Sequence, residues 1–176
     1  MTDYRRAYSP GASWFFTVNL AERRGNRWLL DQIDGLRLAF AYTQQRRPFR
    51  MDAVVILPDH LPCLWTLPAD DADFSIRWNW LKGHFSRSIE KGERLSPSRE
   101  KRRERGLGQR RFWEHLLRDQ ADFNNHIDYI HWNPVKHGWV KRVADWPHSS
   151  FYRLVACCIY PINWGCDGRF EIHGGE

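Results

Sequence analysis

One amphipathic stretch, residues 122–138, constrains the fold of this chain more than any other feature. Its apolar residues recur at helical spacing, which predicts that one face of a helix packs on a core: Phe123, Ile127 and Ile130. Its polar residues fall on a neighbouring face of the same helix: Asp122, His126, Tyr129, Asn133 and His137. Such a pattern is typical of two situations, a solvated polar face or a chemical site.

Within this stretch, Tyr129 and Asn133 are four residues apart, so their side chains should lie one helical turn apart. The pair could offer a phenol nucleophile and an amide oxygen to one site. Pro134 predicts a kink or a restart of the helix, because it lacks an N–H and restricts the residue before it. Gly138 is expected to end the helix.

The order of the remaining elements predicts the fold class. Segments typical of strands lie at 13–20, 49–57, 60–68 and 111–117, and helical spacing occupies 28–46 and 74–89. This β-α-β-β-α-β-α order predicts an α+β fold, a ferredoxin-like or RRM-like antiparallel sheet with helices on one face. A short helix reaching about residue 156 and an irregular tail follow. We expect one domain over residues 1–140, including an N-terminal arm, and an extension over 141–176 that packs on it.

The charge balance points to a polyanionic partner. The chain has 27 Lys and Arg against 21 Asp and Glu, a net charge of +6. Basic residues gather in a loop over 91–111 and in the N-terminal arm, although such a loop can also serve only to solubilise a protein. No apolar run approaches the roughly 20 residues of a membrane span, and the N-terminus lacks the apolar core of a signal peptide, so we expect a cytoplasmic protein. The residues expected to contact nucleic acid are Arg5, Arg6, Arg102, Arg103, Arg105, Arg110 and Arg111.

Several motifs converge on a known family. They are Leu57-Pro58-Asp59-His60, Phe112-Trp113-Glu114-His115, the block from Asp128 to Gly138, and Trp146-Pro147-His148-Ser149-Ser150. Together with residues 8–11 and 15–18, these motifs resemble the REP-associated tyrosine transposases, which are single-tyrosine HUH enzymes. The resemblance runs from about Tyr4 to Trp164. The block from Asp128 is its most specific part, whereas a lone His60 is not specific.

The resemblance implies a HUH-type catalytic domain over residues 1–140 that cuts and rejoins single-stranded DNA near palindromic hairpins. It implies a monomer or homodimer associated with a prokaryotic nucleoid. Tyr129 would be the nucleophile, forming a 5′-phosphotyrosine and freeing a 3′-OH. His60 and Asn133 would hold a divalent cation, Mg²⁺ or Mn²⁺, and His126 would support these ligands from outside the coordination shell. A cation helps such chemistry because the phenol pKa near 10 makes tyrosine a weak nucleophile at neutral pH.

The chain departs from this family at one metal-ligand position. The family has His-x-His on the strand, whereas this chain reads His60-Leu61-Pro62, and proline offers no ligand atom. Cys63 cannot take over the role, because successive strand side chains point to opposite faces. Three functions therefore stay open: a transposase weakened at its metal site, a hairpin-DNA-binding protein without cleavage, and an RRM-like RNA binder with exposed aromatic residues on its sheet.

Overall fold

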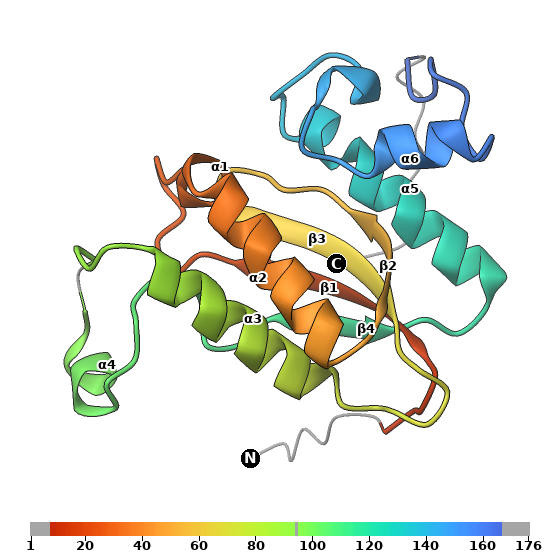
Figure 1. Ribbon diagram of the computed structural model, residues 1–176. Coiled ribbons are helices and arrows are strands. Elements are labelled where there is room, and N and C mark those ends of the chain that lie inside the picture. Colours follow the sequence, from red (N-terminus) through yellow and green to blue (C-terminus); the bar gives the residue numbers. More distant parts are fainter. Residues whose placement is uncertain (1–7, 94, 167–176) are drawn as a thin grey trace, which may run out of the picture.

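A four-stranded antiparallel sheet forms the centre of the molecule (Figure 1). The computed structural model describes residues 8–93 and 95–166. The strands are β1 (Ser13–Asn19), β2 (Arg50–Val54), β3 (His60–Thr66) and β4 (Trp113–Leu116), and they lie in the order β2-β3-β1-β4. All three neighbouring pairs are antiparallel, so β3 and β1 are the central strands. This arrangement confirms the ferredoxin-like fold predicted from the order of elements.

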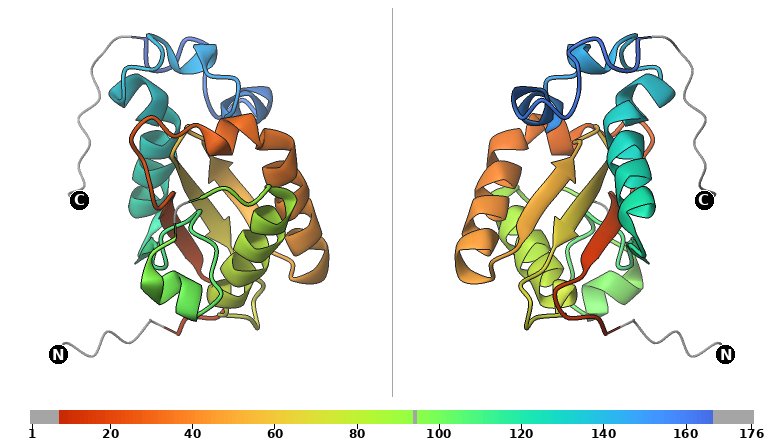
Figure 2. Two further views of the ribbon diagram at one scale, coloured as in Figure 1. Left: turned by 90° about the vertical axis from the view of Figure 1, so that its left-hand side faces the viewer. Right: turned by 90° about the vertical axis from the view of Figure 1, so that its right-hand side faces the viewer.

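The helices divide between the two faces of the sheet (Figure 2). The first face is covered by α2 (Ile33–Arg46) and α3 (Phe74–Ser88), with the short α1 (Trp28–Asp31) leading into α2. The helix α5 (Gln120–Lys136), which carries Tyr129, crosses the opposite face, so the expected placement of helices on one face holds for α2 and α3 but not for α5. Three shorter helices complete the part of the chain that the structure describes: α4 (Pro97–Lys101) in the basic loop, and η1 (Val143–Asp145) and α6 (Phe151–Ala156) after α5.

Alternating side chains on the central strands build a core on each face. Trp14, Phe16 and Trp65 pack with the α2 and α3 residues, and Trp65 stacks on Trp78 with ring centroids 4.2 Å apart. Phe15, the neighbour of both Trp14 and Phe16, points the other way and packs beneath α5. The period of two along β1 therefore decides which residues face the helix that carries Tyr129.

Both ends of α5 are fixed by local hydrogen bonds. At the start, the Asp119 carboxylate accepts a hydrogen bond from the backbone N–H of Asp122, which is an N-cap. At the end, the N–H groups of Gly138 and Trp139 donate to the carbonyls of Val135 and Pro134, and Gly138 has a φ of +71°. These are the paired bonds of a Schellman C-cap, and they confirm the expected stop at Gly138. The restart expected at Pro134 is wrong, because the helix continues through it to Lys136.

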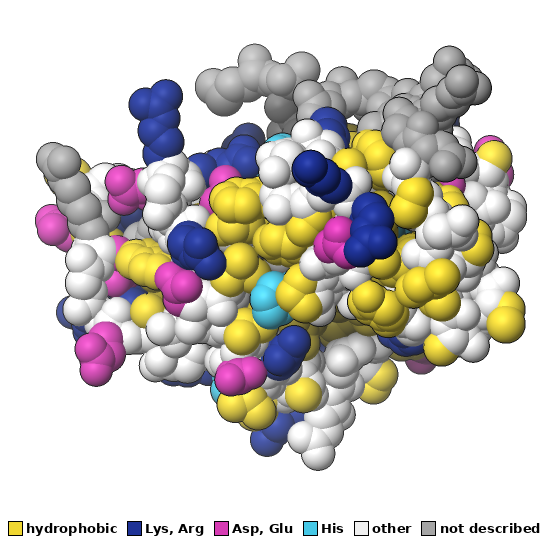
Figure 3. Space-filling model, turned by 90° about the horizontal axis from the view of Figure 1, so that it is seen from above, with side chains coloured by type: hydrophobic (Ala, Val, Ile, Leu, Met, Phe, Trp, Pro, Cys, Tyr) yellow, Lys and Arg dark blue, Asp and Glu magenta, His cyan; other side chains and the backbone are white. Residues whose placement is uncertain are grey.

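The segment after α5 packs back on the same helix. Val143, Phe151, Leu154 and Tyr160 form a cluster with Ile127, Trp132 and Val135 of α5. Two polar contacts add to it: the Tyr160 hydroxyl donates to Asp128, and His131 Nε2 lies 2.9 Å from Ser150 Oγ. Figure 3 shows hydrophobic side chains spread over this end of the molecule, with Lys and Arg among them. Within the described ranges, no helix has both the length and the apolar character needed to cross a bilayer.

Candidate functional site

The site forms where α5 meets the start of β3. Asn133, from the fourth turn of α5, and His60, the first residue of β3, are both buried. Asn133 Oδ1 lies 3.4 Å from His60 Nε2, although 73 residues separate them in the sequence. Two residues predicted to bind one cation are thus brought together by the packing of the helix on the sheet.

A carboxylate behind His60 sets the orientation of the ring. Asp59 Oδ1 lies 2.7 Å from His60 Nδ1, and Arg23 Nε donates to Asp59 Oδ2 at 2.6 Å. Burial alone would raise the pKa of Asp59, but the hydrogen bonds from His60 and Arg23 outweigh it and lower this pKa. An ionised Asp59 favours the His60 tautomer with its proton on Nδ1, although Arg23 Nη2 also lies 3.4 Å from that nitrogen. The shorter contact to the carboxylate decides the tautomer, and Nε2 is left with a lone pair.

Two acceptors then face each other at the centre of the site. Asn133 Nδ2 donates to the carbonyl of Tyr129 at 3.4 Å, so Oδ1 is the atom turned towards His60. A nitrogen lone pair and an amide oxygen at this separation repel unless a proton or a cation lies between them. This geometry, with a carboxylate supporting the histidine from behind, is the arrangement that metal-binding histidines commonly have. His60 and Asn133 therefore fit the cation that the resemblance implies.

Tyr129 lies one turn before Asn133 on the same face of α5. Its ring packs edge-on against Phe15, with centroids 5.9 Å apart, and it is only partly buried. Lys136 Nζ lies 4.9 Å from the centre of the Tyr129 ring.

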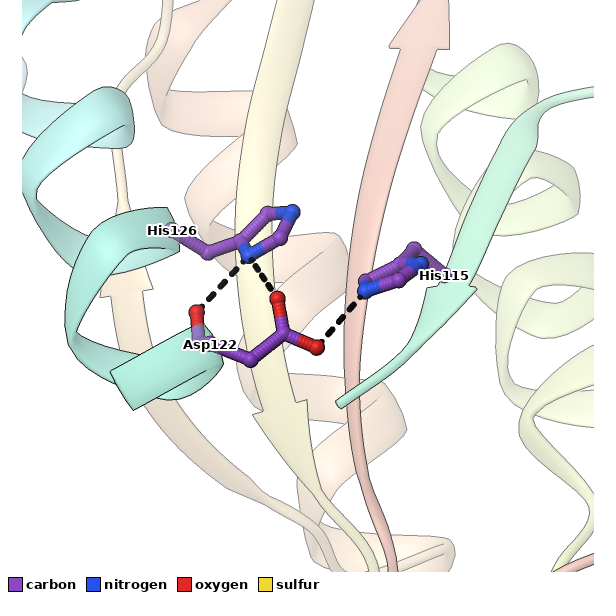
Figure 4. Close-up of side chains that lie close together, drawn as sticks. All are labelled: His115, Asp122 and His126. Atoms are coloured by element: carbon purple, nitrogen blue, oxygen red, sulfur yellow. Dashed lines mark hydrogen bonds and ion pairs between the residues drawn. The ribbon is translucent and has the colours of Figure 1, made fainter. Parts of the chain in front are cut away.

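A second polar cluster lies towards the other end of α5, at His115, Asp122 and His126 (Figure 4). His115 Nε2 lies 2.9 Å from Asp122 Oδ2, and His126 Nδ1 lies 3.1 Å from Asp122 Oδ1. Burial tends to raise the pKa of Asp122, but hydrogen bonds from His115 and Arg118 lower it to about 2. Burial, together with nearby His115, lowers the pKa of His126. One potential ligand atom from each residue lies within 4.8 Å of the others, so the cluster could hold a cation.

Internal hydrogen bonds already account for this second cluster. The rings of His115 and His126 are stacked, 4.8 Å apart and 20° from parallel, and both turn a nitrogen towards Asp122. His126 Nδ1 also lies 2.8 Å from the carbonyl of Asp122. The predicted support of His60 and Asn133 by His126 stays a prediction, since the contacts of His126 described here are with this cluster and Phe15. His115 was not anticipated as a partner, although alternation along β4 places it on the α5 side.

Position 62 lies on the same face as His60, beside the site. Pro62 is buried in the central strand β3 and stands opposite Thr17 of β1. Its carbonyl accepts a hydrogen bond from the N–H of Val55, but its own nitrogen has no proton to return to the Val55 carbonyl. Compared with the His-x-His that the resemblance implies, proline at this position lacks both an imidazole and a donor to the sheet.

His137, the C-cap residue of α5, also approaches His60. The two ring centroids lie 5.0 Å apart and the ring planes meet at 76°. Burial, followed by the electrostatic influence of nearby His60, lowers the pKa of His137. The sequence placed His137 on the polar face of the helix, but it gave no sign that this residue reaches His60.

The basic loop contains both paired and unpaired arginines. The Arg105 guanidinium is tied to Glu93 and to the backbone carbonyls of Ser86 and Ile89, and Arg110 pairs with Glu104 at 2.7 Å. Arg102, Arg103 and Arg111 are exposed, and no carboxylate of the described chain pairs with them. Arg5 and Arg6 lie outside the described residues. Arg105 thus has a structural task in shaping the loop.

The sheet and the tyrosine-bearing helix opposite a strand histidine define a single-tyrosine HUH-type protein. No family model matches the chain. It is 46% identical over 167 residues to a REP-associated tyrosine transposase of Escherichia coli (strain K12), covering 95% of this chain and 93% of the relative. It is also 46% identical over 175 residues to a Haemophilus influenzae protein given the same family name, covering 99% of each. A solved structure described as a REP-associated tyrosine transposase bound to a REP hairpin superposes with a TM-score of 0.81 and 44% identity, covering 100% of this chain and 98% of the other.

The chain belongs to the REP-associated tyrosine transposases. This membership decides against the RRM-like RNA binder, and the fold agrees, because α5 covers the sheet face on which such a protein would present its aromatic residues.

Proposed function

We propose that this chain cuts and rejoins single-stranded DNA at hairpins, through a covalent bond between Tyr129 and the DNA. The observation that carries the proposal is the contact of Asn133 with His60, one turn from Tyr129 on the same helix. The relative solved with a REP hairpin supports DNA hairpins as the substrate class.

In the proposed reaction, the Tyr129 oxygen attacks the phosphorus of the scissile phosphodiester. The bond from phosphorus to the 3′ oxygen breaks, which leaves a 5′-phosphotyrosine and a free 3′-OH. An incoming 3′-OH reverses the step and releases Tyr129, so strands are exchanged without an external energy source. A cation bound by His60 and Asn133, Mg²⁺ or Mn²⁺, would offset the charge that develops on the phosphate.

The remaining residues of the site have supporting tasks. Asp59 and Arg23 hold the His60 ring, and Lys136 lies beside the Tyr129 ring. We assign the cutting and joining chemistry to residues 1–140, with residues 141–176 as an extension. Its part up to residue 166, where the described residues end, stabilises α5 through the cluster around Phe151. Exposed arginines of the basic loop, Arg102, Arg103 and Arg111, are assigned to phosphate contacts.

A labelled hairpin substrate tests the proposal against its alternative, a protein that binds hairpins without cutting them. The hairpin carries a single-stranded extension labelled at its 3′ end, since a 5′-phosphotyrosine retains the 3′ segment. We expect a labelled protein band on a denaturing gel in the presence of Mn²⁺. DNA that is retarded on a native gel but never becomes attached to protein would favour the binding protein.

A further inference from the structure

The metal site of this chain lacks the second strand histidine, and one imidazole lies close enough to replace it. We propose that His137 supplies that second imidazole, so that His60, Asn133 and His137 together hold the cation. The proposal rests on the proposed function, because it concerns the same metal site. It departs from the family pattern in taking a ligand from the end of α5 in place of position 62 of β3.

The positions of the two rings support shared coordination. Two imidazoles bound to one cation through bonds of about 2.1 Å have ring centroids roughly 4.6–5.3 Å apart when the bonds meet at about 90–110°. The His60 and His137 centroids are 5.0 Å apart, and the planes are inclined by 76° rather than stacked. The His115 and His126 rings are a useful contrast, because their centroids lie 4.8 Å apart but the rings are nearly parallel. One nitrogen of each ring, His115 Nε2 and His126 Nδ1, contacts the Asp122 carboxylate.

The backbone positions of the three ligands also fit one site. Asn133 and His137 are four residues apart at the end of α5, so their side chains leave the same side of the helix. The N–H of His137 donates to the carbonyl of Asn133 at 3.0 Å, and the Schellman bonds that follow fix this last turn. Asn133 Oδ1 already faces His60 Nε2. A cation between these atoms would lie on the side of α5 that also carries His137, whose ring centroid is 5.0 Å from that of His60.

His137 is exposed, so this ligand would lie at the mouth of the site. Three protein ligands leave coordination positions open for water and phosphate oxygens, as a catalytic site requires. Position 62 is buried within β3, whereas His137 is exposed at the end of α5. The replacement would thus move one ligand from a strand to a helix end while His60 and Asn133 stay in place.

Metal titration of the full chain without DNA tests the proposal, with Mn²⁺ binding followed by calorimetry and by loss of the free Mn²⁺ electron paramagnetic resonance signal. We expect His137→Ala to weaken Mn²⁺ binding roughly 10–100-fold. In a Pro62→His background, His137→Ala should weaken Mn²⁺ binding by less than about threefold, because the strand again supplies an imidazole. Pro62→Ala is the matched control for the backbone N–H, and His115→Ala tests the second cluster.

The outcomes separate this inference from the proposed function. Two results would overturn the proposal that His137 replaces the strand histidine. One is Mn²⁺ binding that His137→Ala leaves unaffected, and the other is an equal loss of Mn²⁺ affinity from His137→Ala in the unchanged chain and in Pro62→His. Binding that disappears with His115→Ala and not with His137→Ala would move the cation to the second cluster and also overturn it. Absence of Mn²⁺ binding in every variant, Pro62→His included, would remove the metal site itself and with it the proposed chemistry. Because His137 is exposed, its alanine variant should fold, which circular dichroism checks.

Discussion

Asn133 of α5 and His60 of β3 face each other across 3.4 Å, each turning an acceptor towards the other. The carboxylate of Asp59 and the backbone carbonyl of Tyr129 hold the two side chains in this arrangement. Nothing in the local sequence of either residue requires the contact, which results from α5 lying across the sheet. A pair of acceptors held in this way is suited to a cation.

The first prediction concerns Asn133 itself. Asn133→Ala removes the amide oxygen and should lower the rate of DNA cleavage at limiting Mn²⁺ by roughly 10–100-fold. Asn133→Asp keeps an oxygen ligand and adds a charge, so it should retain cleavage. Rates from single-turnover time courses over a series of Mn²⁺ concentrations measure both effects. Equal rates for Asn133→Ala and the unchanged chain would show that Asn133 is not a ligand.

Position 62 gives a second prediction with a matched control. Pro62→His and Pro62→Ala both restore an N–H to the Val55 carbonyl, worth about 0.5–1.5 kcal/mol. Replacing proline also makes the unfolded chain more flexible, which lowers the free energy of unfolding by roughly 0.4–1 kcal/mol and offsets part of this gain. We therefore expect similar denaturation midpoints for the two variants, whereas only Pro62→His should raise cleavage at limiting Mn²⁺, by roughly tenfold. Equal cleavage by the unchanged chain and Pro62→His, together with Mn²⁺ binding that His137→Ala leaves unaffected, would contradict the placement of the metal beside this strand.

The basic loop leads to a third prediction that distinguishes two kinds of arginine. Arg102→Ala with Arg103→Ala removes two exposed charges, so the slope of log affinity for single-stranded DNA against log salt should become shallower by roughly 1.4. Arg105→Ala should instead make the loop more susceptible to proteolysis, since Arg105 forms an ion pair with Glu93 and a hydrogen bond with the carbonyl of Ser86. Fluorescence anisotropy at several salt concentrations measures the slope. An unchanged slope in the double variant would mean that the loop only solubilises the protein.

Buried His131 provides a fourth prediction, on pH. Burial is the main reason that its pKa is lowered to about 3, whereas in the unfolded chain it is near 6.5. Between pH 3 and pH 6.5 the unfolded chain binds a proton on His131 that the folded chain does not. The contribution of His131 to stability is therefore fully present above pH 6.5 and declines as the pH falls towards 3. His131 should contribute up to about 1.4 kcal/mol per pH unit to this decline.

Urea denaturation at pH 7, 6 and 5 measures the decline. His131→Asn removes the titrating group while keeping a polar side chain near Ser150, so the stability of this variant should depend less on pH. His148→Gln is the comparison, because His148 is less buried and its removal should change the slope less. An equal pH dependence in the unchanged chain and His131→Asn would contradict the prediction.

Much of the fold could be predicted because its elements are encoded locally. Alternation in β1 and helical spacing in α5 identify both elements and the faces that they bury. The passage of α5 through Pro134 could not be predicted, since it depends on packing of the helix against the sheet and the C-terminal segment. Tertiary packing can outweigh the cost of one missing backbone hydrogen bond.

Only part of the site could be predicted from the sequence. The roles of Tyr129, His60 and Asn133 came from the family resemblance, and the structure adds that two of them are in contact. The approach of His137 to His60, and of His115 to Asp122, depends on where α5 crosses the sheet. Residues so distant in sequence carry no local pattern that predicts such contacts.

The central claim is that Tyr129 becomes bonded to DNA, and mapping of the covalent adduct tests it most directly. After reaction with the 3′-labelled hairpin substrate and Mn²⁺, the protein is digested and the DNA-bearing peptide is identified by mass spectrometry. We predict a phosphodiester on Tyr129, and we predict that Tyr129→Phe abolishes the adduct while binding the hairpin nearly as well as the unchanged chain. Tyr152→Phe serves as the control, since we expect loss of this exposed tyrosine hydroxyl to leave the yield of the adduct unchanged. An adduct that persists in Tyr129→Phe, or that maps to Tyr152 or Tyr160, would contradict the account.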